Sequence, residues 1–184
     1  MILVTVGAQM PFDRLIQAVD AWAGSTGRGD VLAQIGPGGW RPRNIQWTEF
    51  LAPSEFEAKV DAASVLVAHA GMGSILTALV RGRPILVMPR RGDLRETRND
   101  HQVATARKFE AQGKIAVAMD EKVLLERLNQ MQHLAPGAAI GPFASPELIR
   151  TIRQFIGLTE SEVFVPEIIT FPVSNNGSQH HSRV

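Results

Sequence analysis

The stretch that decides the fold is His69-Ala70-Gly71-Met72-Gly73-Ser74. Before it, residues 64–68 form a short apolar run with two β-branched valines, which predicts a buried parallel strand. After it, residues 75–81 predict a helix. Glycine lets a ligand approach the backbone closely, and the first N–H groups of a helix carry partial positive charge. Such a turn is a candidate site for a phosphate or diphosphate, although similar turns are common in any α/β protein.

Composition narrows the class of protein. The chain has 184 residues, 45% of them hydrophobic and 20% charged, which predicts one soluble globular domain with a tail. The net charge of +1 implies no strong attraction to nucleic acid, so no nucleic-acid partner is expected. The absence of cysteine excludes disulfides, thiolate chemistry and zinc sites built on cysteine.

Neither end of the chain suggests a membrane segment. The N-terminus has no basic region and no long apolar core, so it does not read as a signal peptide. No apolar run approaches the roughly 20 residues that a membrane span needs. We therefore expect a cytoplasmic protein that reaches a membrane only through a partner.

Short apolar runs alternate with amphipathic segments along the chain. Six strands are predicted: five at such runs, residues 2–6, 31–35, 65–68, 85–88 and 115–117, and a short one at residues 45–50, which carries Trp47. This alternation predicts an α/β fold: a Rossmann-like parallel sheet of about six strands with helices on both faces. The strand that opens the chain is expected to be central in the sheet.

Helix starts and the domain boundary are also predicted. Asp13 is a candidate N-cap, Ser54 and Glu57 suggest a capping box, and Ser145-Pro146 begins a last helix that ends at Gly157. We expect residues 1–157 to form the domain. Residues 158–184 form a tail, partly disordered or partner-binding, in which the proline-broken apolar segment 163–172 packs on a partner or back on the domain.

Ligands bind beyond the carboxyl ends of the strands in such sheets. Three unusual loops follow predicted strands there, at residues 7–13, 69–74 and 89–102. Within them, Gln9 contacts a ligand or merely caps the first helix, and His69 contacts a ligand or bonds to the backbone.

The third loop carries a run of charges and leads into a helix. Arg90 and Arg91 follow the strand, and a ligand role is weighed against a solvated loop whose acidic residues offset the arginines. Asn99 is a candidate ligand residue or an N-cap. His101 and Gln102 are expected to face the cleft and could hydrogen-bond a polyhydroxylated ligand.

Several motifs of other enzyme classes are missing. The Gly-Lys-Ser/Thr ending of P-loop NTPases and a full Gly-x-Gly-x-x-Gly fingerprint are absent, which disfavours ATP hydrolysis and a nicotinamide cofactor. No two aspartates are spaced as Asp-x-Asp, so no metal is expected, and a bound diphosphate would be neutralised by helix N-termini and glycine turns.

Three motifs together carry a resemblance: residues 4–13 (Val-Thr-Val-Gly-Ala-Gln-x-Pro-Phe-Asp), residues 69–74, and Met-Pro-Arg-Arg at 88–91 with Asn-Asp-His-Gln at 99–102. Across residues 1–157 the chain resembles the C-terminal, donor-binding domain of family 28 GT-B glycosyltransferases. It is most similar to the small split subunits: PssE-type exopolysaccharide subunits and the catalytic subunit of the two-protein N-glycan GlcNAc transferase.

The resemblance implies roles for particular residues. The diphosphate of a UDP-sugar would be held by the two glycine turns, through Gly7, Gln9, Gly71, Gly73 and Ser74. His101 and Gln102 match a pair that contacts sugar hydroxyls. Thr77 stands where many relatives carry a ribose-binding glutamate. The full expected donor-binding set is Gly7, Gln9, His69, Gly71, Met72, Gly73, Ser74, Thr77, Arg90, Arg91, Asn99, His101 and Gln102.

The resemblance also implies a function. We expect the donor-binding catalytic subunit of a two-component inverting glycosyltransferase, acting on a UDP-sugar and a lipid-linked polysaccharide precursor. A membrane-anchored, acceptor-binding subunit would supply the general base. Arg90 and Arg91 favour glucuronic acid as the sugar, with GlcNAc and galactose next. The alternatives are a non-catalytic nucleotide-sugar-binding module and a stand-alone nucleotide-sugar epimerase.

Overall fold

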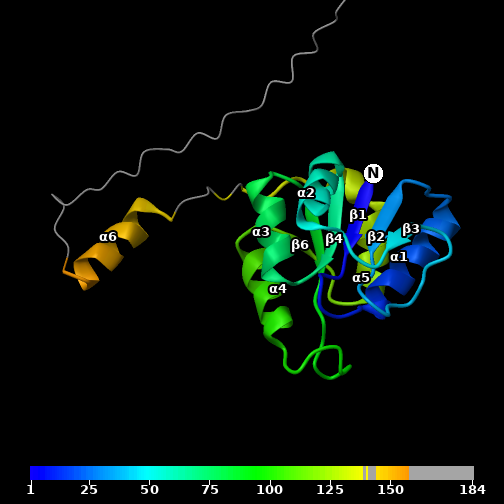
Figure 1. The fold of residues 1–184 in the computed structure, drawn as a ribbon, viewed down its shortest axis with the longest axis horizontal. Coiled ribbons are helices and arrows are strands. Elements are labelled where there is room, and N and C mark those ends of the chain that lie inside the picture. The colour runs from blue at the N-terminus through cyan, green and yellow to red at the C-terminus, as the bar shows by residue number, and fades with distance from the viewer. Residues whose placement is uncertain (139, 141–143, 158–184) are drawn as a thin grey trace, which may run out of the picture. The chain divides into compact units, whose positions relative to one another are not determined.

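The computed structural model describes residues 1–138, 140 and 144–157 (Figure 1). These residues fall into two units, one spanning Met1–Pro142 and the other beginning at Phe143. The first unit contains the sheet and the three loops. The second contains helix α6 (Pro146–Phe155), and the tail segment 163–172 lies outside the described residues.

The first unit is built on a six-stranded parallel sheet in the order β3-β2-β1-β4-β5-β6. The strands are β1 (Ile2–Thr5), β2 (Val31–Gln34), β3 (Gln46–Thr48), β4 (Val65–His69), β5 (Ile85–Met88) and β6 (Ala116–Val117). β1 lies between β2 and β4, so the prediction of a central first strand is confirmed. This strand order reverses direction between β1 and β4, which is the point where doubly wound sheets bind their ligands.

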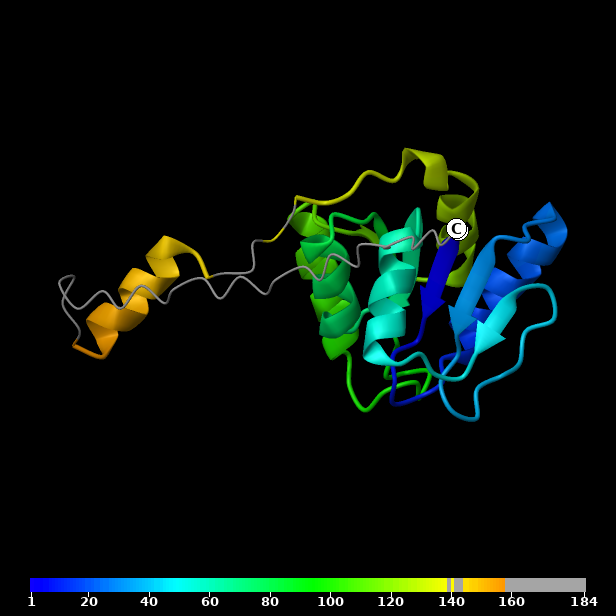
Figure 2. The ribbon, with the colours of Figure 1, turned by 45° about the horizontal axis from the view of Figure 1, so that its top comes forward.

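Helices cover both faces of the sheet, as predicted (Figures 1 and 2). The helices of the first unit are α1 (Asp13–Thr26), α2 (Pro53–Ala62), α3 (Met72–Val80), α4 (His101–Ala111) and α5 (Glu121–Asn129), with a 3-10 turn at Met131–His133. Successive side chains of a strand point to opposite faces, and β1 shows this directly. Ile2 and Val4 belong to the core under α1 and α5, while Leu3 belongs to the core under α2 and α3.

Two of the predicted helix starts are wrong by one or two positions. Phe12, and not Asp13, precedes α1, and the Asp13 carboxylate instead accepts a hydrogen bond from the Trp40 N–H at 3.0 Å. At α2 the proline takes the first helical position, so the acidic residue that reaches back to the Ala52 N–H is Glu55 and not Glu57. Proline fits that position because its missing N–H has no helical partner there.

Helix α6 begins as predicted, with the Ser145 hydroxyl accepting a hydrogen bond from the Leu148 N–H at 3.2 Å. Across the described ranges 1–138, 140 and 144–157, every helix is too short or too polar to cross a bilayer.

Candidate donor-binding site

The three loops predicted to hold the ligand meet at one cleft of about 440 Å³. They meet because β1, β4 and β5 are parallel neighbours, so their carboxyl ends share one edge of the sheet. The volume falls in the range of small-molecule sites. The cleft is lined by Val6, Gly7, Ala8, Gln9, Met10, His69, Gly73, Ser74, Arg90, Glu96, Thr97, His101 and Gln102.

The imidazole of His69 fills the space between the first two loops. A Cβ atom built on Gly7 would lie 2.8 Å from His69 Cε1, and one built on Gly71 would lie 2.2 Å from His69 Nε2. Gly7 also has a φ of +82°, a conformation that side chains disfavour. Both glycines are therefore required for the ring to occupy the switch point between β1 and β4.

His69 is neutral in the folded protein near pH 7. Burial, and next the positive charge of Arg90, lower the pKa of His69 from 6.5 to about 4. Its Nδ1 is buried and has no hydrogen-bond partner among the described residues. A neutral imidazole can offer a hydrogen bond to an anion but adds no positive charge.

Because the pKa of His69 is lowered in the folded protein, we expect the free energy of unfolding to depend on pH in the acid range. Between about pH 6.5 and 4 the unfolded chain binds a proton at His69 that the folded chain does not, so stability falls as the pH is lowered through this window. Above pH 6.5 His69 does not change the free energy of unfolding. Over the whole window its contribution to that free energy falls by about 3 kcal/mol. Urea unfolding of the wild type and His69→Gln from pH 7.5 to 4.5 should show a shallower decline in the variant, and equal declines would contradict the pKa assignment.

The N-terminus of α3 points its unpaired donors at the same cleft. Gly71 precedes the helix, so the N–H groups of Met72, Gly73 and Ser74 are the ones that an α-helix leaves without carbonyl partners. Gly73 is exposed, and a Cβ built on it would meet nothing within 4 Å. The backbone is therefore open to close approach by an anion at the position where the helix dipole favours one.

The start of α4 forms the opposite wall. Gln102 is buried, and its side-chain oxygen accepts a hydrogen bond from the Arg90 N–H at 3.1 Å. This bond orients the amide so that its nitrogen remains available as a donor. Asn99 accepts a hydrogen bond from the His101 N–H at 3.2 Å and its oxygen also contacts the His101 ring. Asn99 thus orients His101 and does not itself line the cleft.

Arg90 and Arg91 do not share the role expected of them. Arg90 is 5% exposed, and its guanidinium donates to the carbonyls of Val6 (3.0 Å), Met10 (2.7 Å) and Pro11 (2.6 Å). Burial lowers the pKa of Arg90, which nevertheless keeps its charge at neutral pH. Its hydrogen bonds hold the first loop in place, so a direct grip on a sugar carboxylate is not what this geometry provides.

Arg91 points to a different cleft. Its guanidinium pairs with the Asp93 carboxylate at 2.6 Å, on the surface. It lines a second hollow of about 400 Å³, together with Pro89, Asp93, Asp100, Val103, Arg107 and Met119. Arg91 therefore does not line the cleft that Arg90 lines, although both were expected there.

The structure thus brings together eight of the thirteen expected residues and leaves five outside the lining. The eight are Gly7, Gln9, His69, Gly73, Ser74, Arg90, His101 and Gln102. Gly71, Met72 and Thr77 lie on or beside α3 without lining the cleft, as do Asn99 and Arg91 in the third loop. Five further residues line it and lie outside the expected set: Val6, Ala8, Met10, Glu96 and Thr97. Glu96 is the acidic residue at the centre of the arginine-rich loop, which was its only signal.

Metal-ligand chemistry has no candidate here. Within the part of the chain that the structure describes, no group of three or more His, Asp or Glu residues is arranged to hold an ion. Positive potential at the cleft comes from the Arg90 guanidinium and from the partial positive charge of the α3 N-terminus.

The chain is similar to proteins that use nucleotide-sugars. It is 28% identical over 148 residues to the UDP-N-acetylglucosamine transferase subunit ALG13 of Eremothecium gossypii, a match that covers 61% of this chain and 71% of that one. The NMR solution structure of ALG13 covers 82% of this chain and 93% of its own length, with 19% identity and a TM-score of 0.53.

Larger enzymes share the fold. Os79 from O. sativa, solved in complex with UDP, matches 72% of this chain at 14% identity and a TM-score of 0.55. The kitacinnamycin glycosyltransferase matches 72% at 20% identity and a TM-score of 0.54. This chain spans only about a third of either enzyme, 31% and 34% respectively. At these identities the likeness is one of fold.

The sequence itself decides the family. Residues 1–135 match the glycosyltransferase family 28 C-terminal domain, and this stretch contains all six strands and the whole of the cleft. The chain therefore belongs to the glycosyltransferase family 28 C-terminal domain family.

Proposed function

We propose that this chain is the donor-binding subunit of a two-component inverting glycosyltransferase. It holds a UDP-sugar in the cleft between the β1, β4 and β5 loops. A second, membrane-anchored polypeptide supplies the acceptor site and the general base, and the sugar passes to a lipid-linked saccharide at the cytoplasmic face of the membrane. Membership of this glycosyltransferase family supports a nucleotide-sugar as the ligand. The ALG13 relative, which is named as a subunit, supports the need for a second polypeptide.

One observation carries the proposal: two glycine turns and an open helix N-terminus converge on one cleft around a neutral histidine. A diphosphate needs hydrogen-bond donors and positive potential without bulky side chains in the way. The N–H groups at Gly73 and Ser74 provide the first, and the α3 dipole with the Arg90 charge provides the second. His101 and the Gln102 amide lie where they could donate to sugar hydroxyls.

For the sugar, we propose N-acetylglucosamine ahead of glucuronic acid. The sequence-based expectation of glucuronic acid depends on Arg90 and Arg91 pairing with its carboxylate. In the fold, Arg90 donates to backbone carbonyls and Arg91 pairs with Asp93. Neither guanidinium is therefore placed to form a two-bond pair with a sugar carboxylate. The remaining arginines of this loop that could pair with a glucuronic acid carboxylate are Arg95 and Arg98, which are exposed and do not line the cleft. The ALG13 relative carries the name of a UDP-N-acetylglucosamine transferase subunit.

Calorimetric titration of the full chain in EDTA tests the proposal. UDP, UDP-GlcNAc and UDP-glucuronic acid should bind at one site, and UDP-GlcNAc should bind at least as tightly as UDP-glucuronic acid. Binding that requires added magnesium or manganese would contradict the view that protein groups neutralise the diphosphate. A clear preference for UDP-glucuronic acid would instead indicate that arginines of the third loop bind the sugar carboxylate.

The two alternatives give different results with the same material. A nucleotide-sugar epimerase would convert free UDP-sugar without any second protein. A regulatory module would bind the donor but support no transfer when its partner is present. The proposed subunit should transfer sugar only together with that partner.

A further inference from the structure

Two arginines cross between the loops that form the donor cleft, in opposite directions. Arg90, from the loop after β5, reaches back to three carbonyls of the loop after β1. Arg14, from the first turn of α1, reaches forward to the loop after β5. Both guanidinium groups lie close to the ring of Phe12, at 4.7 Å for Arg90 and 5.3 Å for Arg14. We call this arrangement of Arg14, Arg90, Phe12 and Glu96 the arginine clasp.

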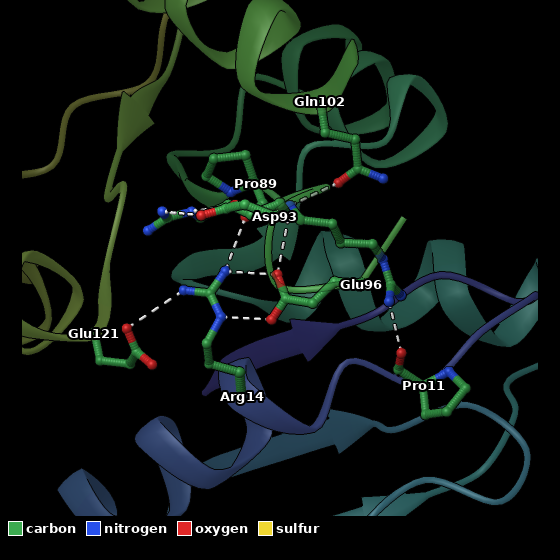
Figure 3. A network of polar contacts seen from close by, with 9 residues as sticks. Pro11, Arg14, Pro89, Asp93, Glu96, Gln102 and Glu121 are labelled. Atoms are coloured by element: carbon green, nitrogen blue, oxygen red, sulfur yellow. Dashed lines mark hydrogen bonds and ion pairs between the residues drawn. The ribbon is translucent and has the colours of Figure 1, made fainter. Parts of the chain in front are cut away.

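The forward half of the clasp is centred on Glu96 (Figure 3). Arg14 binds the Glu96 carboxylate through two parallel hydrogen bonds, Nε to Oε1 at 2.5 Å and a terminal nitrogen to Oε2 at 2.8 Å. The same carboxylate accepts a hydrogen bond from the Arg91 N–H at 2.9 Å. Arg14 also donates to the Pro89 carbonyl at 3.2 Å and pairs with Glu121 at 3.3 Å.

This pair differs from an ordinary surface ion pair. The side chains of Arg14 and Glu96 are 13% and 14% exposed, so water screens them little. The two parallel bonds fix the relative orientation of the groups as well as their separation. By contrast, Arg28 and Asp30 form a similar two-bond pair, at 2.8 and 2.9 Å, whose side chains are 37% and 46% exposed.

The clasp holds residues that line the donor cleft. Glu96 and Thr97 are adjacent in the third loop and both line it, and His101 follows four residues after Thr97. Across the cleft, Gly7 and Gln9 belong to the loop whose carbonyls Arg90 holds.

We propose that Arg14 and Glu96 are positioning residues for the donor: their pair sets the distance between the two loops and thereby the geometry in which a UDP-sugar is bound.

This inference rests on the proposed function, and a titration of the full chain with UDP-GlcNAc tests it at a temperature where every variant is folded. Arg14→Met keeps the length of the side chain and removes its charge, and Glu96→Gln keeps the shape of the carboxylate. Each should weaken binding about tenfold, since small displacements of positioning groups have effects of this size or larger. Arg14→Lys, which keeps the charge but cannot form two parallel bonds, should fall between the wild type and Arg14→Met.

The matched control is Arg28→Met, which breaks the exposed two-bond pair before β2. It should leave the affinity for UDP-GlcNAc at the wild-type value. Hydrogen exchange supplies a readout without ligand: the Arg91 amide, which donates to Glu96, should lose protection in Glu96→Gln and Arg14→Met but not in Arg28→Met.

Two failures are distinguishable. If the wild type binds UDP-GlcNAc and Arg14→Met and Glu96→Gln bind it equally well, the positioning role is overturned while the proposed function stands. If the wild type binds no UDP-sugar, the proposed function fails and the inference fails with it. An affinity that falls in Arg28→Met as much as in Arg14→Met would show a general loss of stability and would also overturn the positioning role.

Discussion

Replacing Gly73 by valine is expected to weaken UDP-sugar binding at least about a hundredfold, a loss of about 3 kcal/mol, while the protein stays folded. A Cβ at this position meets no atom within 4 Å, so the protein can accept the side chain. Gly73 is the second residue of α3, where valine is a better helix former than glycine. The new side chain would stand in the cleft, over the N–H groups that we assign to the diphosphate.

The control for this change is Gly29→Val. Gly29 is exposed, also has open space around the Cβ position, and lies before β2, at the opposite edge of the sheet from the cleft. Both variants should show the circular dichroism and melting temperature of the wild type to within a few degrees. Unchanged donor affinity in a folded Gly73→Val protein would remove the N-terminus of α3 from the site.

Arg90→Met is expected to have the largest effect on stability, a loss of about 3 kcal/mol or more in the free energy of unfolding. The change leaves the carbonyls of Val6, Met10 and Pro11 without their charged donor. A hydrogen bond to a charged group contributes about 1.5–3 kcal/mol, and unmade bonds at buried carbonyls add to the cost. Urea denaturation measures the loss.

The neighbouring residue supplies the comparison. Arg91 pairs with Asp93 on the surface, where such pairs contribute about 0–1 kcal/mol, so Arg91→Met should cost less than about 1 kcal/mol. Similar losses for the two variants would show that the hydrogen bonds of Arg90 do not hold the first loop.

The sequence predicts the architecture well because hydrophobic patterning dominates it. All six strands lie where the sequence predicted them, five of them at short apolar runs, and the parallel arrangement follows from the alternation with helices. The sheet order then brings the loops at residues 7–13, 69–74 and 89–102 to one edge, as expected. Helix starts were less predictable, because α1 and α2 begin after Phe12 and Ala52, whose side chains make no capping hydrogen bond and so leave no signal in the sequence.

The details of the site were harder to predict because they depend on the direction in which side chains point. A loop with four arginines suggested an anion grip, yet the two arginines nearest the strand face opposite ways and bind protein groups. Glu96 read as a charge that merely offset these arginines, and it binds Arg14, which lies 82 residues away in the sequence. Local patterning cannot reveal a partner so distant in the sequence, whereas the glycine turns are visible because the backbone itself requires them.

A titration of the isotope-labelled full chain with UDP, followed by amide NMR spectra, tests the central claim most directly. The diphosphate should move the amide signals of Gly7, Gly73 and Ser74 most, with Thr97 next, because these residues line the cleft from three loops. The amides of Val103 and Met119, in the second hollow beside Arg91, should move little. No change on adding UDP, or changes confined to that second hollow, would contradict the assignment of this cleft as the donor site.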